Sequence, residues 1–208
     1  MGSSMLYEAY VFNPTYPVYN DEGDFYDVPP YRVNPVSFAS EILDERKNRK
    51  FLGNLTADWN FYKPFTFQVN LGYTYNSIER NSYISKSNLL GGYVSVQKLQ
   101  DYSRLLETIL KYNQKFGKHS IDAMLGYSYQ YFYDEGNHTR AYGFLSDTFK
   151  WYSLAAAKTV ESISSFAESN TLISMYGRIN YNYGDKYLFT ATVRRDGSSR
   201  FGADHKRG

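Results

Sequence analysis

The sequence predicts an all-β chain in which about six long strands follow one another as an antiparallel meander, a partial wall of a large outer-membrane β-barrel. Three observations lead to this fold class. Apolar and polar residues alternate with a period of two along several segments. These segments are longer than most strands of soluble proteins, and tight turns alternate with long connections.

The alternation is clearest between Phe65 and Tyr75. The odd positions of this segment hold Phe, Val, Leu and Tyr, whereas the even positions hold Thr, Gln, Asn and Gly. A tilted strand needs about 9–11 residues to cross a bilayer, and most of the alternating segments reach that length. The segments are residues 51–61, 65–75, 121–131, 173–183 and 187–193, with a less regular one at 103–116.

The connections between the segments differ in length. Bacterial outer-membrane barrels have short turns on one side, long loops on the other and aromatic girdles at both boundaries, and aromatic residues crowd the tight turns here. The tight turns, at 62–65, 116–119 and 183–186, contain Pro, Gly or Asp, and the long polar connections are 13–50, 76–92 and 134–170. The chain is thus divided into an outer loop region at 1–50, hairpins at 51–76, 103–134 and 171–197, and an outer loop at 135–170.

The composition limits the alternatives. Without Cys there are neither disulfides nor cysteine-based metal sites, and a net charge of +2 gives no reason to expect a nucleic-acid partner. The mean hydropathy is −0.56, and no stretch approaches the roughly 18 apolar residues of a membrane helix. A soluble β-sandwich that binds carbohydrate is the alternative fold. The polar strand positions, however, hold more Asn, Thr, Gln and Ser than Lys and Glu, which favours a hydrated barrel lumen.

The run from Arg178 to Gly202, with the core Arg-Asp-Gly-Ser-Ser-Arg-Phe-Gly, closely resembles a segment of the SusC/RagA family of TonB-linked outer-membrane transporters from Bacteroidetes-type bacteria. Three other stretches resemble the same family, in the expected order. They are Tyr-Pro-Val-Tyr-Asn-Asp-Glu-Gly at 16–23, Asn-Pro-Val at 34–36, and the hairpin with Phe-Gly-Lys-His at 116–119 and Leu-Gly-Tyr-Ser-Tyr-Gln at 125–130. The resemblance covers nearly the whole chain.

This resemblance implies one part of an outer-membrane importer of large nutrients, either glycans or peptides. Members of the family work with a SusD-like surface lipoprotein and with the TonB complex, and a plug inside the barrel moves during transport. The plug domain and the remaining strands of a barrel of about 22 strands are expected outside these 208 residues. The residues after Met1 form no signal peptide, since neither a basic nor an apolar stretch follows.

The family signature follows a predicted strand, and we expect it to have a structural role at the barrel rim. Its Gly would allow a turn, and its Asp and Ser would bind local backbone groups. Its arginines are expected to pair with the aspartate or with phosphate of lipopolysaccharide in the outer-membrane lipid. The signature consists of Arg194, Arg195, Asp196, Gly197, Ser198, Ser199, Arg200, Phe201 and Gly202.

Several aromatic residues of the predicted outer loop are candidates for contact with a substrate or with a lid lipoprotein. Exposed rings stack on sugar faces and on peptide side chains. The alternative is that they pack against one another within a large loop. A short helix is expected at 153–165, which contains consecutive alanines. The candidates are Tyr142, Phe144, Phe149, Trp151 and Tyr152.

No residue pattern predicts catalysis, a bound metal or a cofactor. The sequence has no Gly-x-Ser-x-Gly nucleophile elbow, and His119, His138 and His205 stand alone, without metal-ligand spacing. The acidic run at 20–24 lacks the spacing of a calcium loop, so a solvated turn is expected there. A secreted hydrolase on a β scaffold would need a nucleophile or a converging pair of acids, which the sequence does not offer.

Overall fold

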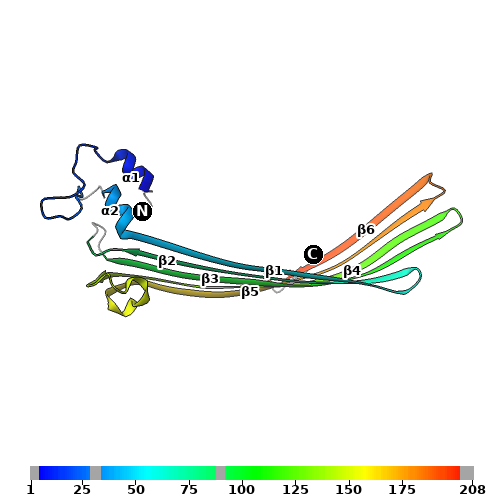
Figure 1. The fold of residues 1–208 in the computed structure, drawn as a ribbon. Helices are drawn as coiled ribbons and strands as arrows, with labels where there is room; N and C mark the ends of the chain where they lie inside the picture. Colours follow the sequence, from blue (N-terminus) through cyan, green and yellow to red (C-terminus); the bar gives the residue numbers. More distant parts are fainter. Residues whose placement is uncertain (1–4, 29–33, 88–91, 202–208) are drawn as a thin grey trace. The chain divides into compact units, whose positions relative to one another are not determined.

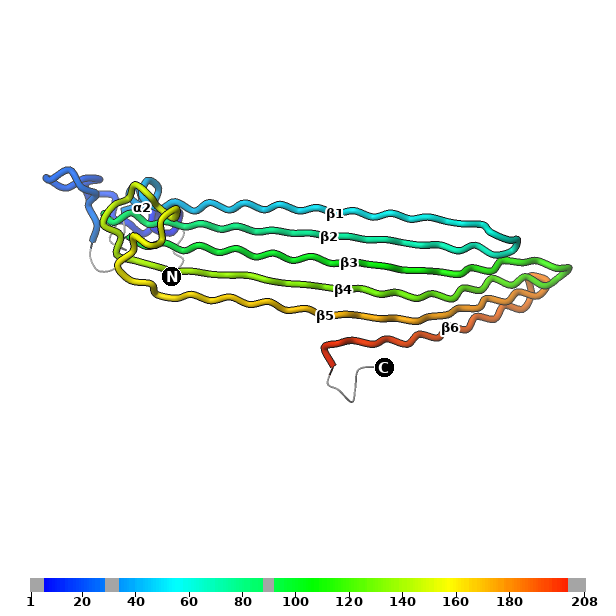
Figure 2. The backbone as a smooth tube through the Cα atoms, turned by 90° about the horizontal axis from the view of Figure 1, so that it is seen from below, coloured from blue at the N-terminus to red at the C-terminus, as the bar shows by residue number. Residues whose placement is uncertain are grey.

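Six strands form one sheet in the structure, a computed structural model that describes residues 5–28, 34–87 and 92–201. The strands are paired in chain order, from β1 at one edge to β6 at the other (Figure 1 and Figure 2). The predicted all-β meander is therefore confirmed. The described residues contain no second sheet, and this contradicts the sandwich alternative, which needs two packed layers.

The strands are long and the helices are short. The strands are β1 Ile42–Tyr62, β2 Phe65–Ile84, β3 Tyr93–Phe116, β4 His119–Phe144, β5 Ala157–Tyr183 and β6 Tyr187–Ser198. The helices are α1 Met5–Val11 and α2 Pro35–Glu41, with short 3-10 helices η1 Lys150–Tyr152 and η2 Leu154–Ala156. No helix in the described part of the chain is long and apolar enough to cross a membrane.

The strands extend beyond the alternating segments of the sequence. β1 begins at Ile42, β4 continues to Phe144 and β5 begins at Ala157, so large parts of the predicted loops are strand. The backbone ladder continues where both faces of a strand are polar, but there the hydropathy pattern fades. The strands are therefore longer than predicted, because alternating hydropathy detects only those parts of a strand that have one apolar face, whereas backbone pairing does not require one.

The helix expected at 153–165 is absent. The consecutive alanines contribute only the single turn of η2, and β5 starts directly after it. Thr159, Val160 and Ile163 follow, and their β-branched side chains favour extended backbone.

The connections keep the predicted asymmetry. A few residues join the strands at the three tight turns, whereas 85–92 and 145–156 join them at the opposite ends. In the turn between β5 and β6, Gly184 and Asp185 have positive φ angles of 58° and 57°. Asn182 Nδ2 donates to Asp185 Oδ1 at 2.7 Å, and the Asp185 amide donates to Asn182 Oδ1 at 3.0 Å. The Asn and Asp side chains thus stabilise a backbone conformation that most residues avoid.

The chain consists of two compact units. The first unit comprises residues 1–48, 77–99 and 136–166, and the second comprises 49–76, 100–135 and 167–208. The first unit contains both α-helices, η1, η2 and a small hydrophobic core. Its buried members are Tyr83, Val94, Ala141 and Phe144, and Leu43, Val96, Trp151, Leu154 and Ala157 pack against them.

Asn34 ties the N-terminal segment together within the first unit. It is 1% exposed, and its Oδ1 caps α2 by accepting from the Val36 amide at 2.9 Å. Its Nδ2 donates to the carbonyl oxygens of Val18 and Tyr26 at 2.9 and 3.2 Å, and its own amide donates to Asp27 Oδ1 at 2.6 Å. The Asn-Pro motif of the sequence therefore starts a helix with Pro at its first turn and clamps two earlier segments.

The second unit has two chemically different faces. Cross-strand hydrogen bonds between polar side chains define one of them, which we call the polar face. The opposite or apolar face carries large side chains in contact with solvent, such as Leu71 at 45% and Val193 at 71% exposure. Aromatic rings gather on it towards the tight turns, where Phe65 lies 5.0 Å from Tyr112 and His119 lies 4.9 Å from Tyr183, centroid to centroid. Other exposed members are Phe51, Leu55, Trp59, Leu125, Ile173, Met175 and Ile179.

Candidate functional site

The signature residues form the end of β6 and the turn after it. β6 is paired with β5 in continuous register, from Tyr183 opposite Tyr187 to Leu172 opposite Ser198. Phe201 is 57% exposed, and Gly202 lies outside the described residues. The register brings Asp196 opposite Ser174 and Arg195 opposite Met175, so neighbouring signature residues occupy opposite faces.

Arg194 and Asp196 lie on the polar face and bind each other. Arg194 Nε lies 2.9 Å from both carboxylate oxygens of Asp196, and its Nη2 donates to Ser174 Oγ at 3.3 Å. The guanidinium also lies 5.9 Å from the centre of the Tyr176 ring. Both charged side chains are more than half exposed, so this ion pair is worth no more than about 1 kcal/mol.

The end of the signature binds backbone groups of β5. The Ser199 amide donates to the Thr171 carbonyl at 3.0 Å, and the Thr171 amide donates to Ser199 Oγ at 2.9 Å. With its amide oxygen turned towards Arg200, the buried Asn170 accepts from Arg200 Nε and Nη2 at 3.3 and 2.9 Å. Arg200 thus binds Asn170, and Asp196 is bound by Arg194.

Tyr176 is the centre of the polar face. Its hydroxyl donates to Glu107 Oε1 at 2.7 Å, and Asn70 Nδ2 donates to Glu107 Oε2 at 2.8 Å. Between Tyr176 on β5 and Glu107 on β3 lies Gly126 of β4. A Cβ atom at Gly126 would lie 2.2 Å from the ring of Tyr176. The glycine therefore makes room for a ring that reaches across a whole strand.

Hydrogen bonds continue along the polar face towards the tight turns. Asp122 accepts from Asn113 Nδ2 at 3.2 Å and from Asn180 Nδ2 at 3.1 Å. Asn180 Oδ1 in turn accepts from Thr190 Oγ1 at 3.0 Å, so one chain of bonds links β3, β4, β5 and β6. Neutral amides and hydroxyls are the donors of these bonds, and the carboxylates of Glu107 and Asp122 accept most of the bonds on this face.

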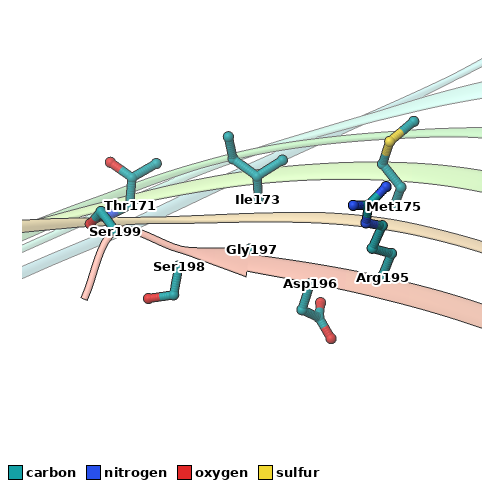
Figure 3. A pocket seen from close by; sticks show the side chains of 8 residues that line it. All are labelled: Thr171, Ile173, Met175, Arg195, Asp196, Gly197, Ser198 and Ser199. Carbon is teal, nitrogen blue, oxygen red and sulfur yellow. The ribbon is translucent and has the colours of Figure 1, made fainter. Parts of the chain in front are cut away.

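A pocket of about 410 Å³ opens beside the signature on the second unit. Thr171, Ile173, Met175 and Arg195 point to one side of the β5–β6 pair, whereas Asp196 and Ser198 point to the other (Figure 3). Gly197, which has no side chain, and Ser199 also line the pocket.

The aromatic candidates of the outer loop divide into two groups in the first unit. Phe144 is 4% exposed and belongs to the hydrophobic core, and Trp151 packs against that core. Tyr142, Phe149 and Tyr152 are 45%, 55% and 78% exposed, so their rings can meet a ligand or partner. Phe144 has almost no accessible surface, because β4 continues to this residue and directs its side chain into the core.

Asp147 fastens the connection 145–156 to β2. Its carboxylate accepts from the Tyr83 hydroxyl, from Ser85 Oγ at 3.0 Å and from the Lys86 amide at 2.9 Å. Burial raises the pKa of Asp147, but these hydrogen bonds and the nearby Lys86 charge outweigh it and lower the pKa below its usual value. Burial, together with the bond to Asp147, raises the pKa of Tyr83. Figure 1 shows this connection, in yellow, at the end of the strands.

We expect Asp147→Ala to loosen the connection 145–156. The substitution leaves the Tyr83 hydroxyl without its acceptor, and such a buried unpaired donor costs about 1–3 kcal/mol. Amide hydrogen exchange of the connection should accelerate roughly tenfold or more. Because the pKa of Asp147 is lowered, its stabilisation is complete above the usual carboxyl pKa and disappears as the pH falls through the native value. In the wild-type protein, exchange of the connection 145–156 should therefore accelerate at acid pH.

Thr148→Ala is the matched control for this experiment. Thr148 lies in the same connection, but among the described residues its hydroxyl hydrogen-bonds only to its neighbour Ser146. Exchange should stay unchanged in this variant. Equal exchange in Asp147→Ala and wild type at neutral pH would show that the carboxylate does not hold the connection.

The remaining polar candidates have structural partners. Asn20 Oδ1 accepts from the amides of Glu22 and Asp24 at 3.0 and 2.9 Å, which makes the acidic run a tight turn. His119 Nδ1 lies 2.6 Å from the Tyr181 hydroxyl, and His138 Nε2 lies 2.9 Å from Ser95 Oγ. His205 lies outside the described residues. Within those residues, no three acidic or His side chains are placed to hold a metal ion.

Curated proteins similar to this chain are receptors. The chain is 31% identical over 215 residues to TonB-dependent receptor P3 of Formosa agariphila, covering 99% of this chain and 21% of the receptor. It is 29% identical over 181 residues to TonB-dependent receptor SusC of Bacteroides thetaiotaomicron, covering 84% of this chain and 17% of SusC. The chain thus spans about a fifth of the length of these relatives. No protein-family model matches the sequence.

Solved structures of a transporter have the same fold. The structure of the RagAB peptide transporter superposes with a TM-score of 0.79 at 22% identity, over 93% of this chain and 23% of the transporter chain. The 'open-open' state of the RagAB peptide importer gives a TM-score of 0.78, also at 22% identity, over 93% of this chain and 22% of the importer chain. The chain is thus homologous, over nearly its whole length, to one segment of the TonB-dependent receptors of the SusC type, and its fold is that of a section of their β-barrel wall.

Proposed function

We propose that these residues supply barrel wall and outer connections to an importer of large nutrients, glycans or peptides, in the outer membrane of a Gram-negative, Bacteroidetes-type cell. The two faces of the second unit carry this proposal. One face carries polar side chains that are hydrogen-bonded between strands and suits a hydrated lumen, and the other exposes Leu, Val, Met and Phe side chains that suit lipid. A protein in water rarely exposes so many large apolar side chains together.

The relatives support transport and not catalysis. They are named as receptors and transporters. Under this proposal, the complete protein works with a SusD-like surface lipoprotein and with the TonB complex, as the likeness to SusC implies. RagAB is named as a peptide transporter, whereas the name of SusC states no substrate. The proposal therefore includes both glycans and peptides.

The exposed rings of the first unit are the proposed contact for substrate or for the lipoprotein. Tyr142, Phe149 and Tyr152 present aromatic surface on or beside the connection 145–156, which Asp147 fastens to β2. A ring that is held in place loses little conformational freedom on binding, and each stacked ring contributes about 0.5–1.5 kcal/mol. Three such rings together would bind a substrate or the lipoprotein more tightly than one exposed ring could.

We expect the combined Tyr142→Ala, Phe149→Ala and Tyr152→Ala variant of the complete receptor to take up substrate roughly tenfold more slowly at low concentration. Uptake of fluorescent oligosaccharides and of fluorescent peptides is measured in parallel in cells that lack the native gene. Growth at saturating substrate should change little, because all three residues lie in the first unit and none lies on the polar face of the second unit.

Leu145→Ala is the control for the aromatic variant. Leu145 is 87% exposed in the same connection but is not aromatic, so its removal should leave uptake unchanged. Cells without the receptor should lose uptake of one of the two substrate classes. Unchanged uptake of both classes in those cells would exclude the proposed importer. Unchanged uptake in the aromatic variant alone would exclude only the role of the rings.

A further inference from the structure

Arg195 occupies an unusual place, because it is a cation on the apolar face. Its side chain points to the same side of the β5–β6 pair as Ile173 and Met175 (Figure 3). Ile173 is 41% and Met175 is 56% exposed, and Val193, the preceding residue of β6 on this face, is 71% exposed. Among the described residues, no carboxylate forms an ion pair with Arg195, whereas neighbouring Arg194 is paired with Asp196 on the other face.

The depth of Arg195 in the wall follows from the register of β5 and β6. The aromatic residues Tyr183 and Tyr187 flank the tight turn and mark one boundary of the apolar band. Arg195 and Gly197 lie about eight to ten residues further along β6. At about 3.3 Å per residue and a tilt of about 40°, this distance is roughly 20–25 Å along the membrane normal. The apolar band of such barrels is about 25 Å tall, so Arg195 lies at its opposite boundary.

The pocket beside Arg195 offers both kinds of contact that a membrane lipid needs. The guanidinium has donors for an anionic headgroup, and Ser199 Oγ accepts from the Thr171 amide and keeps its own proton for a headgroup oxygen. Met175 and Val193 are exposed apolar side chains between the pocket and the turn, and Gly177, opposite Val193, adds no side chain there. An acyl chain can lie along Met175 and Val193.

We propose that one side of the pocket, formed by Thr171, Ile173, Met175, Arg195, Gly197 and Ser199, binds one anionic lipid of the outer membrane, with its phosphate on Arg195 and an acyl chain along Met175 and Val193. This inference rests on the membrane location proposed above. A free inorganic anion would use Arg195 but would gain nothing from the apolar side chains. The combination of a cation with exposed apolar surface therefore selects a lipid and not a solute ion.

The test uses the complete receptor, purified in a non-ionic detergent, with phosphatidylglycerol as the probe. Native mass spectrometry counts the bound lipids over a range of lipid concentrations. Arg195→Gln should lower the affinity for one phosphatidylglycerol about fivefold, because a basic residue at a membrane surface contributes about 1 kcal/mol to binding an anionic lipid. Arg195→Lys should retain part of this affinity, since it keeps the charge and loses the forked donor geometry.

Two further probes separate the possible ligands. Diacylglycerol, which lacks the phosphate, should bind wild type and Arg195→Gln alike. Inorganic phosphate should not displace phosphatidylglycerol at millimolar concentration; displacement would overturn the lipid assignment in favour of a simple anion site. Lys186→Gln is the matched control, because it removes the same charge from the exposed turn at the other end of β6, and it should bind lipid as wild type does.

Unchanged phosphatidylglycerol binding in Arg195→Gln would overturn the inference. Nutrient uptake of the same variants distinguishes this failure from failure of the proposed function. Arg195 does not contact the polar face, so uptake by Arg195→Gln should remain at the wild-type level. A receptor that imports normally but binds no lipid at Arg195 would retain the proposed function and lose only the lipid site.

Discussion

Leu71→Arg is expected to remove most of the receptor from the outer membrane. Leu71 is 45% exposed on the apolar face of β2, about six residues from the tight turn that follows β1, and this places it near the middle of the apolar band. An arginine on the lipid face at mid-depth costs about 2–4 kcal/mol. That is a large part of a typical folding free energy of about 5–15 kcal/mol. Folded receptor is measured in isolated outer membranes by its heat-modifiable migration in gels.

Gln68→Arg is the matched control on the same strand. Gln68 lies an odd number of residues from Leu71, so its side chain belongs to the polar face. An arginine there remains in the hydrated lumen and should leave the folded amount within about twofold of wild type. If both variants accumulate like wild type, the apolar face does not meet lipid. If both are lost, β2 tolerates no charge on either face, and the two faces are not different.

The strands could be predicted from the sequence where one of their faces is apolar. Between Phe65 and Tyr75 the alternation identifies β2 and correctly separates its two faces. Beyond Tyr75 the strand continues to Ile84 through Asn, Ser, Glu and Arg residues, which give no period-two signal. Backbone pairing with β1 and β3 holds this part in the sheet, and pairing depends on the neighbouring strands and not on local hydropathy.

The faces on which the signature residues lie could also be predicted from the sequence. Neighbouring residues of a strand point to opposite faces, so Arg194 and Arg195 must separate. The tight turn at 184–186 then sets the register, and the unbroken ladder of β5 and β6 brings Ser174 opposite Asp196. The expected pairing of Arg194 with Asp196 is present. Arg200, by contrast, binds Asn170, a partner that becomes visible only when the turn at Ser199 is known.

The outer-loop aromatics show where sequence reasoning ends. Composition alone gives no difference between Phe144, which is buried, and Tyr152, which is 78% exposed. The difference comes from the continuation of β4 to Phe144 and from Asp147, which draws the connection towards β2. Asp147 itself carries no sequence signal, because its partners Tyr83 and Ser85 lie more than 60 residues away.

Tyr176 and Gly126 form the contact that the sequence hides most completely. Each residue fits the alternation of its own strand, and neither stands out. Their relation appears only when β3, β4 and β5 lie side by side, because the Tyr176 ring crosses Gly126 to reach Glu107. The long connection 145–156 joins β4 to β5, so no tight turn sets the register that brings Gly126 beside Tyr176. The reach of the ring to the next strand depends on its rotamer.

Gly126→Ala is expected to destabilise the receptor by about 2–3 kcal/mol. The added Cβ would lie 2.2 Å from the Tyr176 ring, so the ring must leave its position and give up its hydrogen bond to Glu107. Losing a hydrogen bond to a charged group costs about 1.5–3 kcal/mol, and crowding adds to this cost. The midpoint of urea unfolding of the receptor in detergent or lipid vesicles measures the effect.

Gly177→Ala is the matched control, and a double-mutant cycle identifies the cause. A Cβ at Gly177 would lie 3.6 Å or more from its neighbours, so this variant should lie within about 1 kcal/mol of wild type. If the added methyl group acts by displacing the ring of Tyr176, the substitution Gly126→Ala should cost almost nothing once Tyr176→Ala has removed the ring, which gives a coupling energy of about 2 kcal/mol. Additive effects would mean that the cost of Gly126→Ala comes from the backbone at Gly126 and not from displacement of the Tyr176 ring. The stability of the polar face would then not depend on a tyrosine that reaches across β4.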